Sequence, residues 1–419
     1  PRPQVAGMEV SDRESVVIMP DRPSAISHQP SATRYLFSGG GTGGGVYPAL
    51  AVINALRAQH PDAAVLWVSG SKGPERDLVT RAGVEFVSVP AGQLVGVGLR
   101  AIPGALKLVA GTVRALGIVR RFRPAALLIT GGWATIPAAL ACWLLRVPVL
   151  IYMPDIEPGS TIRVLSRIAA RVAVTASDSV RFFRPGLAVE TGYPLRADLL
   201  HAAGFDALGQ PLDNPPDTRA AARQRFDPAL PTLLIFGGST GARSINRAAC
   251  AQLADLLGPA DRPNCQILHI SGTLDAAWVR EQAAALPADL AARYHVVEYL
   301  HGEEMALALA AADLAVTRAG ASTLGEFPLF GLPAILVPYP HAWRYQRVNA
   351  DYLESRGAAV RLDDDRLGDH LAPLVAQVLN DAHLRQQMAA SVAALKRPDA
   401  AARIVALLID RTPTPEADL

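Results

Sequence analysis

The sequence predicts an α/β protein with two doubly wound domains, each a parallel sheet between layers of helices, that face a common cleft. Short apolar runs alternate with helical segments along the chain, and these runs are apolar on both faces, as buried parallel strands are. Each half of the chain opens with a glycine-rich turn between a strand and a helix. Half of the 419 residues are apolar and 19 % are charged, which excludes a largely disordered chain.

The apolar runs in the first half of the sequence predict seven strands. They are Tyr35–Ser38, Ala64–Ser69, Phe86–Val89, Ala126–Thr130, Pro148–Tyr152, Val172–Thr175 and Ala188–Thr191. Helices are expected at Pro48–Gln59 and Gly104–Phe122, the second with a proline at its start. Residues 125–153 carry a single charge, but glycines and prolines divide them. We therefore interpret them as a buried strand, helix and strand and not as a membrane span.

The second half predicts six more strands and at least two helices. The strands are Thr232–Phe236, Gln266–Ser271, His295–Glu298, Leu314–Thr317, Ala334–Pro338 and Ala359–Leu362. The helices are Arg243–Leu257 and Ser322–Phe330. We expect a disordered tail at 1–33, an N-terminal domain at 34–198, a linker at 199–228, a C-terminal domain at 229–400, and a final helix and tail at 401–419.

The charge distribution indicates the kind of partner, and the cysteine content indicates the cellular compartment. Residues 34–198 hold 18 Lys/Arg against 9 Asp/Glu, whereas residues 199–419 hold 19 against 25. The basic half suggests contact with an anionic partner. We expect no nucleic-acid partner and no cofactor. Three cysteines without metal-ligand spacing favour a reducing compartment, and the start of the chain shows no secretory signal.

A basic stripe is predicted on the helix at 104–122. Lys107, Arg114 and Arg121 are seven residues apart and therefore share one face, with apolar neighbours beside them. No Asp or Glu occurs between Phe86 and Pro154. The stripe predicts docking on an anionic membrane surface, and the alternative is an ordinary solvated helix face.

The first glycine loop, residues 38–45, reads SGGGTGGG between a strand and a helix. Its backbone amides can cradle a pyrophosphate. The second strand lacks the terminal acid that a dinucleotide site needs, and the loop lacks the lysine of nucleotide hydrolases. A tight turn without a ligand is the alternative.

Three motifs in the second half could bind a nucleotide sugar. The turn FGGSTGA at 236–242 precedes a helix and suits a diphosphate. In TRAGASTLGE at 317–326, Arg318 could pair with a phosphate, and Glu326 could accept hydrogen bonds from a ribose or complete a helix capping box. The sequence PYPH at 338–341 is followed by Gln346 and Asn349, and His341 alone is as readily structural as catalytic.

Taken together, these motifs resemble the MurG-type transferases, a family that adds N-acetylglucosamine from UDP-GlcNAc to a membrane-bound muramyl-pentapeptide lipid. The likeness spans about residues 34–400 and includes TGGW at 130–133 and TGYPLR at 191–196. It implies a GT-B fold, inversion at the sugar, catalysis without a metal, and peripheral attachment to the inner face of the cytoplasmic membrane.

The motifs and the resemblance assign the following residues. Donor binding is expected at Thr42, Gly43, Gly44, Arg196, Ser239, Thr240, Leu300, Arg318, Ala321, Ser322, Thr323, Leu324, Gly325, Glu326, Gln346 and Asn349. Acceptor-side roles are expected at Gly41, Gly45, Tyr47, Gly131, Gly132 and Trp133.

The chain departs from the family on the acceptor side. The family has His where this chain has Gly45, and a His-Glu-Gln-Asn run where this chain has residues 152–155. An inverting transfer needs a base for the acceptor hydroxyl. Asp155 is the candidate, with Glu157 in reserve, and the alternative for Asp155 is a turn residue after Pro154.

Four functions remain open from the sequence. The first is N-acetylglucosaminyl transfer to a lipid-linked muramyl-pentapeptide, and the second is a UDP-sugar transferase with another lipid or small-molecule acceptor. The third is a UDP-sugar-binding paralogue without catalysis, and the fourth is a UDP-sugar epimerase. The intact donor motifs argue against the third, and the basic, acid-free segment argues against the fourth.

Overall fold

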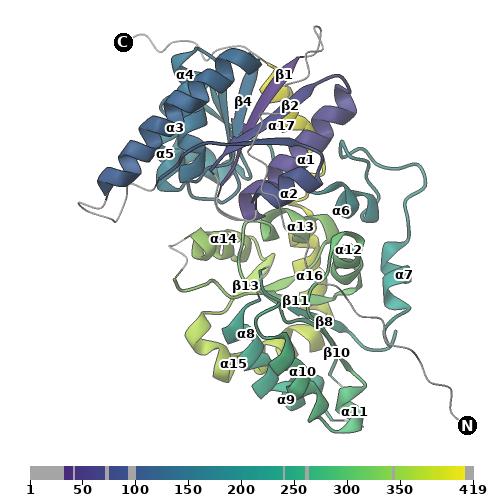
Figure 1. Cartoon of the computed structure of the whole chain (residues 1–419). Coiled ribbons are helices and arrows are strands. Elements are labelled where there is room, and N and C mark those ends of the chain that lie inside the picture. The colour runs from purple at the N-terminus through teal and green to yellow at the C-terminus, as the bar shows by residue number, and fades with distance from the viewer. Residues whose placement is uncertain are drawn as a thin grey trace, which may run out of the picture. The chain divides into compact units, whose positions relative to one another are not determined.

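The computed structural model describes residues 33–40, 43–70, 75–92, 101–238, 241–259, 264–341 and 345–410, without the side chains of Gly43, Ala101 and Ile102. Residues 32–419 form one compact unit. The predicted tail lies outside the described residues apart from Thr33. Figure 1 shows the elements and their labels.

Among the described residues of the first half, seven parallel strands form one sheet in the order β3-β2-β1-β4-β5-β6-β7. They are β1 (Arg34–Ser38), β2 (Ala64–Ser69), β3 (Glu85–Ser88), β4 (Ala126–Ile129), β5 (Val149–Met153), β6 (Arg171–Val174) and β7 (Ala188–Glu190). The helices are α1 (Gly43–Gln59), α2 (Glu75–Arg81), α3 (Ala101–Phe122), α4 (Ile136–Leu144), α5 (Ser160–Leu165), α6 (Ala197–Ala202) and α7 (Thr218–Arg223).

The described residues of the second half form a six-stranded parallel sheet in the order β10-β9-β8-β11-β12-β13. Its strands are β8 (Thr232–Phe236), β9 (Gln266–Ile270), β10 (Tyr294–Val297), β11 (Leu314–Thr317), β12 (Ala334–Leu336) and β13 (Ala359–Arg361). The helices are α8 (Arg243–Ala251), α9 (Leu253–Leu257), α10 (Ala276–Ala284), α11 (Ala288–Ala291), α12 (Gly302–Ala311), α13 (Thr323–Phe330), α14 (Tyr345–Glu354), α15 (Leu367–Asn380), α16 (Ala382–Ala393) and α17 (Ala400–Ile409).

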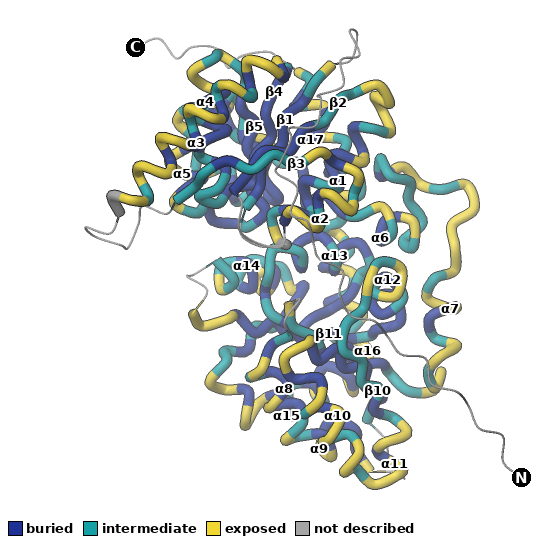
Figure 2. The backbone as a smooth tube through the Cα atoms, viewed as in Figure 1, coloured by how far each residue is buried: buried dark blue, intermediate teal, exposed yellow. Residues whose placement is uncertain are grey.

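Both sheets have the doubly wound order, so the predicted fold class is confirmed. The strand order reverses between β1 and β4 and again between β8 and β11. In such sheets ligands bind outside the carboxyl ends of the strands at this point of reversal. The central strands of both sheets are buried, as Figure 2 shows, because parallel sheets are covered on both faces. The edge strands β3 and β7 are only partly buried.

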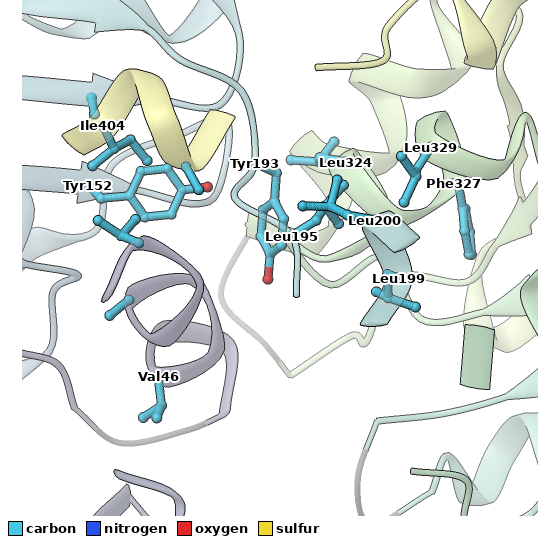
Figure 3. Packing of buried hydrophobic residues seen from close by; sticks show 14 of the residues in the cluster. Val46, Tyr152, Tyr193, Leu195, Leu199, Leu200, Leu324, Phe327, Leu329 and Ile404 are labelled. Atoms are coloured by element: carbon cyan, nitrogen blue, oxygen red, sulfur yellow. The ribbon is translucent and has the colours of Figure 1, made fainter. Parts of the chain in front are cut away.

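The chain crosses between the halves more than once. Helices α6 and α7, in the segment expected to be a linker, both pack on α12 of the second half. The final helix α17 returns to the first sheet, where it packs on α1 and on β4, β5 and β6. Figure 3 shows Ile404 of α17 close to Tyr152 of β5. One apolar cluster therefore contains residues from both halves.

One predicted helix is divided. The segment expected at 243–257 forms α8 and α9, which are separated at Gln252, where the backbone leaves the helical region. The Gln252 side chain donates to the carbonyls of Ala248 and Leu367, each at 3.0 Å, and accepts from the Ala372 amide at 3.1 Å. These bonds to α15 stabilise the break.

Candidate active site

A cavity of the second half lies at the carboxyl ends of β8, β11 and β12 and has a volume of about 820 Å³. It brings together the second, third and fourth motifs, which are far apart in the sequence. Among the lining residues are Gly237, Gly238, Gly241, Thr317, Arg318, Gly320, Ser322, Thr323, Tyr339, Pro340, His341 and Gln346. This is the place where a doubly wound sheet binds a nucleotide.

The turn between β8 and α8 requires glycine at two positions. A Cβ on Gly237 would lie 2.4 Å from the Ala242 nitrogen, and Gly241 has a φ of 88° with no room beside the Ser271 carbonyl. This close turn directs the N-terminus of α8 to the cavity, and a helix N-terminus favours anions. Ser239 and Thr240, the predicted hydroxyls, lie outside the described residues.

Arg318 lines the cavity but is held by protein groups. Its guanidinium pairs with the Asp364 carboxylate and donates to Ser244 Oγ at 2.6 Å and to the Val337 carbonyl at 3.2 Å. Its charge centre lies 5.2 Å from the centre of the Tyr339 ring. A phosphate bound by Arg318 would share the guanidinium with these partners.

Glu326 lies one turn into α13, partly buried, in a cluster with Arg196, Asp198 and Ser322. Burial raises its pKa to about 7, against the opposing effect of the Arg196 charge and a hydrogen bond with Ser322. Ser322 is the N-cap of α13 but makes no side-chain cap bond. The capping-box alternative for Glu326 is therefore not what the structure contains.

Tyrosines from both halves surround this carboxyl group. The Arg196 guanidinium lies 5.7 Å from the centre of the Tyr47 ring, and Tyr47 is hydrogen-bonded to Tyr299. Gly325 allows α13 to approach Tyr193, because a Cβ there would lie 2.7 Å from the Tyr193 Cβ. Leu324 is buried beside Tyr193 in Figure 3, and Leu300 packs partly buried on the same apolar cluster.

The two candidate bases follow β5 and differ in their surroundings. Burial raises the pKa of Asp155, and a 2.9 Å hydrogen bond from Asn349 Nδ2 opposes that rise. Glu157 is buried and accepts from Arg163 at 2.7 Å. Because the Arg163 guanidinium already holds the Glu157 carboxylate, the geometry favours Asp155 as the base.

The fourth motif divides between the cavity and the contact with the first half. Gln346 lines the cavity and accepts from the Tyr339 amide at 2.8 Å, and the exposed His341 packs its ring against Tyr339. Asn349 is fully buried, and its amide is bonded to Asp155, Ile156 and Ala319. A donor contact by Asn349 would have to displace one of these bonds.

On the acceptor side, the first glycine loop closes around the hydroxyl of Thr130. A Cβ on Gly45 would lie 2.9 Å from Thr130 Oγ1, and one on Gly39 would lie 2.8 Å from it. Gly131 and Gly132 have φ values of 96° and 85° and begin the turn to Trp133. Gly43 and Gly44, at the end of this loop, begin α1, whereas Gly41 and Thr42 lie outside the described residues.

The basic stripe lies on the surface of α3. Lys107, Arg114 and Arg121 are all exposed. The predicted apolar neighbours Leu106, Val109 and Val113 of α3 are exposed as well. The sequence did not predict the exposed apolar side chains of Trp143 and Leu144 on α4 and Val164 on α5, and all six are at least half exposed. No helix of the described chain is long and apolar enough to cross a membrane.

Several cavity residues were not predicted. Ser244, Arg247, Leu274, Asp275 and Asp364 line the cavity. Asp364 follows the last strand, and that position alone could have indicated it, since residues after parallel strands meet at one edge. Within the described residues no group of three His, Cys, Asp or Glu side chains could hold a metal ion.

Two family descriptions match this chain. The glycosyltransferase family 28 N-terminal domain matches residues 35–174, and the family 28 C-terminal domain matches residues 232–404. The boundary between the matches falls in the segment that carries α6 and α7.

Curated relatives share most of the chain. A relative from Roseiflexus sp. (strain RS-1) is 39 % identical, and the match covers 88 % of this chain and 93 % of the relative. A relative from Symbiobacterium thermophilum is 36 % identical, and the match covers 90 % of this chain and 96 % of the relative. Both are called UDP-N-acetylglucosamine–N-acetylmuramyl-(pentapeptide) pyrophosphoryl-undecaprenol N-acetylglucosamine transferase.

Solved structures agree in fold. The Acinetobacter baumannii MurG crystal structure has a TM-score of 0.69 at 25 % identity and covers 90 % of this chain and 99 % of its own. A Neisseria meningitidis UDP-GlcNAc 2-epimerase has a TM-score of 0.59 at 13 % identity, with 90 % and 100 % coverage, and shares the fold alone. From both domain matches and these relatives, the chain belongs to glycosyltransferase family 28.

Proposed function

We propose that this protein transfers N-acetylglucosamine from UDP-GlcNAc to a lipid-linked muramyl-pentapeptide in peptidoglycan synthesis. The observation that carries the proposal is the cavity at the ends of β8, β11 and β12, where three donor motifs meet in a chain of this family. The names of the relatives give the donor and the acceptor of the reaction that those proteins carry out.

The donor is proposed to lie between the cavity and the Glu326 cluster. The N-terminus of α8 is proposed to face the diphosphate, and Arg196 adds positive charge. Ser239 and Thr240 stay predicted donor residues from the sequence alone. The Glu326 carboxylate accepts from the ribose hydroxyls. Gln346, on the wall of the cavity, is available to the sugar.

The chemical step is proposed as a single displacement at the anomeric carbon. The acceptor hydroxyl oxygen forms the new bond while the bond from that carbon to the phosphate oxygen breaks, and UDP leaves with the bonding electrons. Asp155 takes the acceptor proton, with Glu157 in reserve. Backbone amides and arginines balance the charge that develops on UDP, and no metal ion is required.

The membrane surface is proposed to contact α3, α4 and α5. Exposed apolar side chains on these helices lie beside Lys107, Arg114 and Arg121 and provide a surface for acyl chains and anionic headgroups. We expect this contact to bring the lipid-linked acceptor to the first glycine loop. The proposed domains at 34–198 and 229–400 then hold the acceptor and the donor.

A UDP-sugar transferase with another acceptor is the second candidate. Gly45 and Asp155 favour it, because both differ from the family at acceptor-side positions. The deciding experiment measures UDP release from UDP-GlcNAc with and without a lipid I analogue. Release that depends on this acceptor supports the first function, whereas dependence on a different lipid or small molecule supports the second.

A further inference from the structure

Asn349 connects the two halves of the site through one buried side chain. Its Nδ2 donates to Asp155 Oδ1 at 2.9 Å and to the Ala319 carbonyl at 3.1 Å, and its Oδ1 accepts from the Ile156 amide at 3.1 Å. The residue has no exposed surface. Both amide hydrogens and the amide oxygen are therefore used.

The three partners come from opposite sides of the proposed reaction. Asp155 and Ile156 follow β5 of the first sheet, and Ala319 lies in the donor motif at 317–326, after β11. Asn349 itself is on α14, whose second residue, Gln346, lines the donor cavity. A single amide thus joins the candidate base, the donor loop and the helix at the cavity wall.

The surrounding contacts keep this connection fixed. Ser179 Oγ donates to the Ile156 carbonyl at 2.8 Å, which holds the loop after β5. At the other end of α14, Arg356 pairs with Asp178 at 2.7 Å. The loop after β5 and the chain at the end of α14 are therefore both bonded to the segment after β6, which carries Asp178 and Ser179.

We propose that Asn349 is a positioning residue that holds Asp155 as an oriented carboxylate against the donor half. This rests on the proposed role of Asp155 as the base. An N–H donor stabilises the ionised form of the carboxyl group that accepts its hydrogen bond. No hydrogen bond within the described residues occupies Asp155 Oδ2, which leaves that oxygen for the acceptor proton.

Among the described residues, three tyrosines interact electrostatically with Asp155. Tyr152 comes from β5, Tyr193 from the segment before α6, and Tyr345 from the start of α14. Their own pKa values are raised, in each case first by burial, so they stay neutral near pH 7. At saturating UDP-GlcNAc, where the pH dependence of donor binding by Glu326 no longer limits the rate, the fall in rate on the acid side of the pH profile (the acid limb) reports Asp155 and its bond from Asn349.

The test compares Asn349→Ala with Gln346→Ala from the same helix. The measurements are kcat/KM for the acceptor between pH 5.5 and 9 at saturating UDP-GlcNAc, the Kd of UDP, and thermal unfolding. Asn349→Ala should move the acid limb up by about one to two pH units, since a hydrogen bond to a charged group is worth about 1.5–3 kcal/mol and about 1.36 kcal/mol corresponds to one unit. The Kd of UDP should stay within about twofold.

Gln346→Ala should instead raise the KM for UDP-GlcNAc and leave the acid limb in place. If Asn349→Ala does not fold, Asn349→Asp keeps the size and sets a second carboxyl group against Asp155, which should move the limb further up. An unmoved limb with weaker UDP binding would overturn the proposal and make Asn349 a donor contact. An unmoved limb with unchanged UDP binding would overturn it as well.

The double variant Asp155→Asn/Asn349→Ala separates this inference from the function. If Asp155→Asn alone costs turnover and adding Asn349→Ala costs nothing more, both ideas stand. If Asp155→Asn keeps full turnover, the proposed base is wrong and the inference fails with it. If Asp155→Asn is inactive but Asn349→Ala leaves the acid limb unmoved, only the positioning role fails.

Discussion

Burial changes the acid–base chemistry of the carboxyl groups at this site. Glu326 and Asp155 both have raised pKa values because they are largely removed from water, whereas Glu157 is buried beside an arginine. Sequence spacing located all three, since each follows a strand or begins a helix. It could not reveal that Arg318 is bound to Asp364 or Asn349 to Asp155, because those partners lie far away along the chain.

Glu326 is expected to make UDP binding depend on pH. The ionised carboxylate accepts from a ribose diol and the protonated group accepts less well, so with a pKa of about 7 affinity should rise between pH 6 and pH 8. Glu326→Ala should weaken UDP by about tenfold to a hundredfold. Calorimetric titration checks both, with the exposed Glu303→Ala as control. Equal affinity at the two pH values in the wild-type protein would contradict this role.

Asp155→Asn is expected to lower turnover and leave UDP binding intact. General-base catalysis contributes about 10²–10⁴-fold, and the amide cannot take the acceptor proton. Initial rates at saturating substrates measure the loss, and Glu157→Gln provides the comparison. A loss under about threefold in Asp155→Asn would transfer the role to Glu157 or to a mechanism without a base.

At the scale of elements, the pattern of apolar runs located every strand of both sheets, because buried parallel strands leave a strong signal in sequence. Helix boundaries were less accurate. Helix α1 starts within the glycine loop, and Gln252 divides α8 from α9 through bonds to α15. Side-chain bonds between distant elements have no local pattern from which to predict them.

Helix α3 is expected to provide electrostatic attraction to membranes. Each basic residue near an anionic surface contributes about 1 kcal/mol, so replacing Lys107, Arg114 and Arg121 with Glu should weaken partitioning by at least about 150-fold. Co-sedimentation with anionic and neutral vesicles at two salt concentrations measures this partitioning. Replacing Leu106, Val109 and Val113 with Ser should weaken binding to both vesicle types. Undiminished binding of the charge variant to anionic vesicles would leave the stripe as a solvated helix face.

His269 of β9 is expected to make stability depend on pH. Its ring lies between Tyr294 Oη at 2.6 Å and Asn246 Oδ1 at 3.0 Å, and burial lowers its pKa to about 4. The unfolded chain therefore binds the proton first as pH falls. The free energy of unfolding should drop by up to about 3 kcal/mol between pH 6.5 and 4. Urea unfolding of wild type and His269→Gln checks it, and an equally steep decline in the variant would exclude His269 as its source.

At the scale of the whole molecule, the two sheets are joined by chain crossings and by polar contacts at the site. Helix α17 returns to the first sheet. Asn349 of α14 bonds to the loop after β5, and Arg356, just beyond α14, pairs with Asp178 after β6. The fold class and the donor motifs followed from sequence because each is a local pattern. The contacts between halves did not, because they join residues almost 200 positions apart.

Transfer of N-acetylglucosamine to a lipid-linked muramyl-pentapeptide tests this account most directly. UDP-GlcNAc and the lipid acceptor are incubated with the protein in excess chelator, and UDP release and the mass of the lipid product are followed. We predict UDP release only with acceptor, a product heavier by one N-acetylglucosamine, and a rate unchanged by the chelator. UDP release without acceptor, an epimerised sugar, or no product despite bound UDP would contradict it.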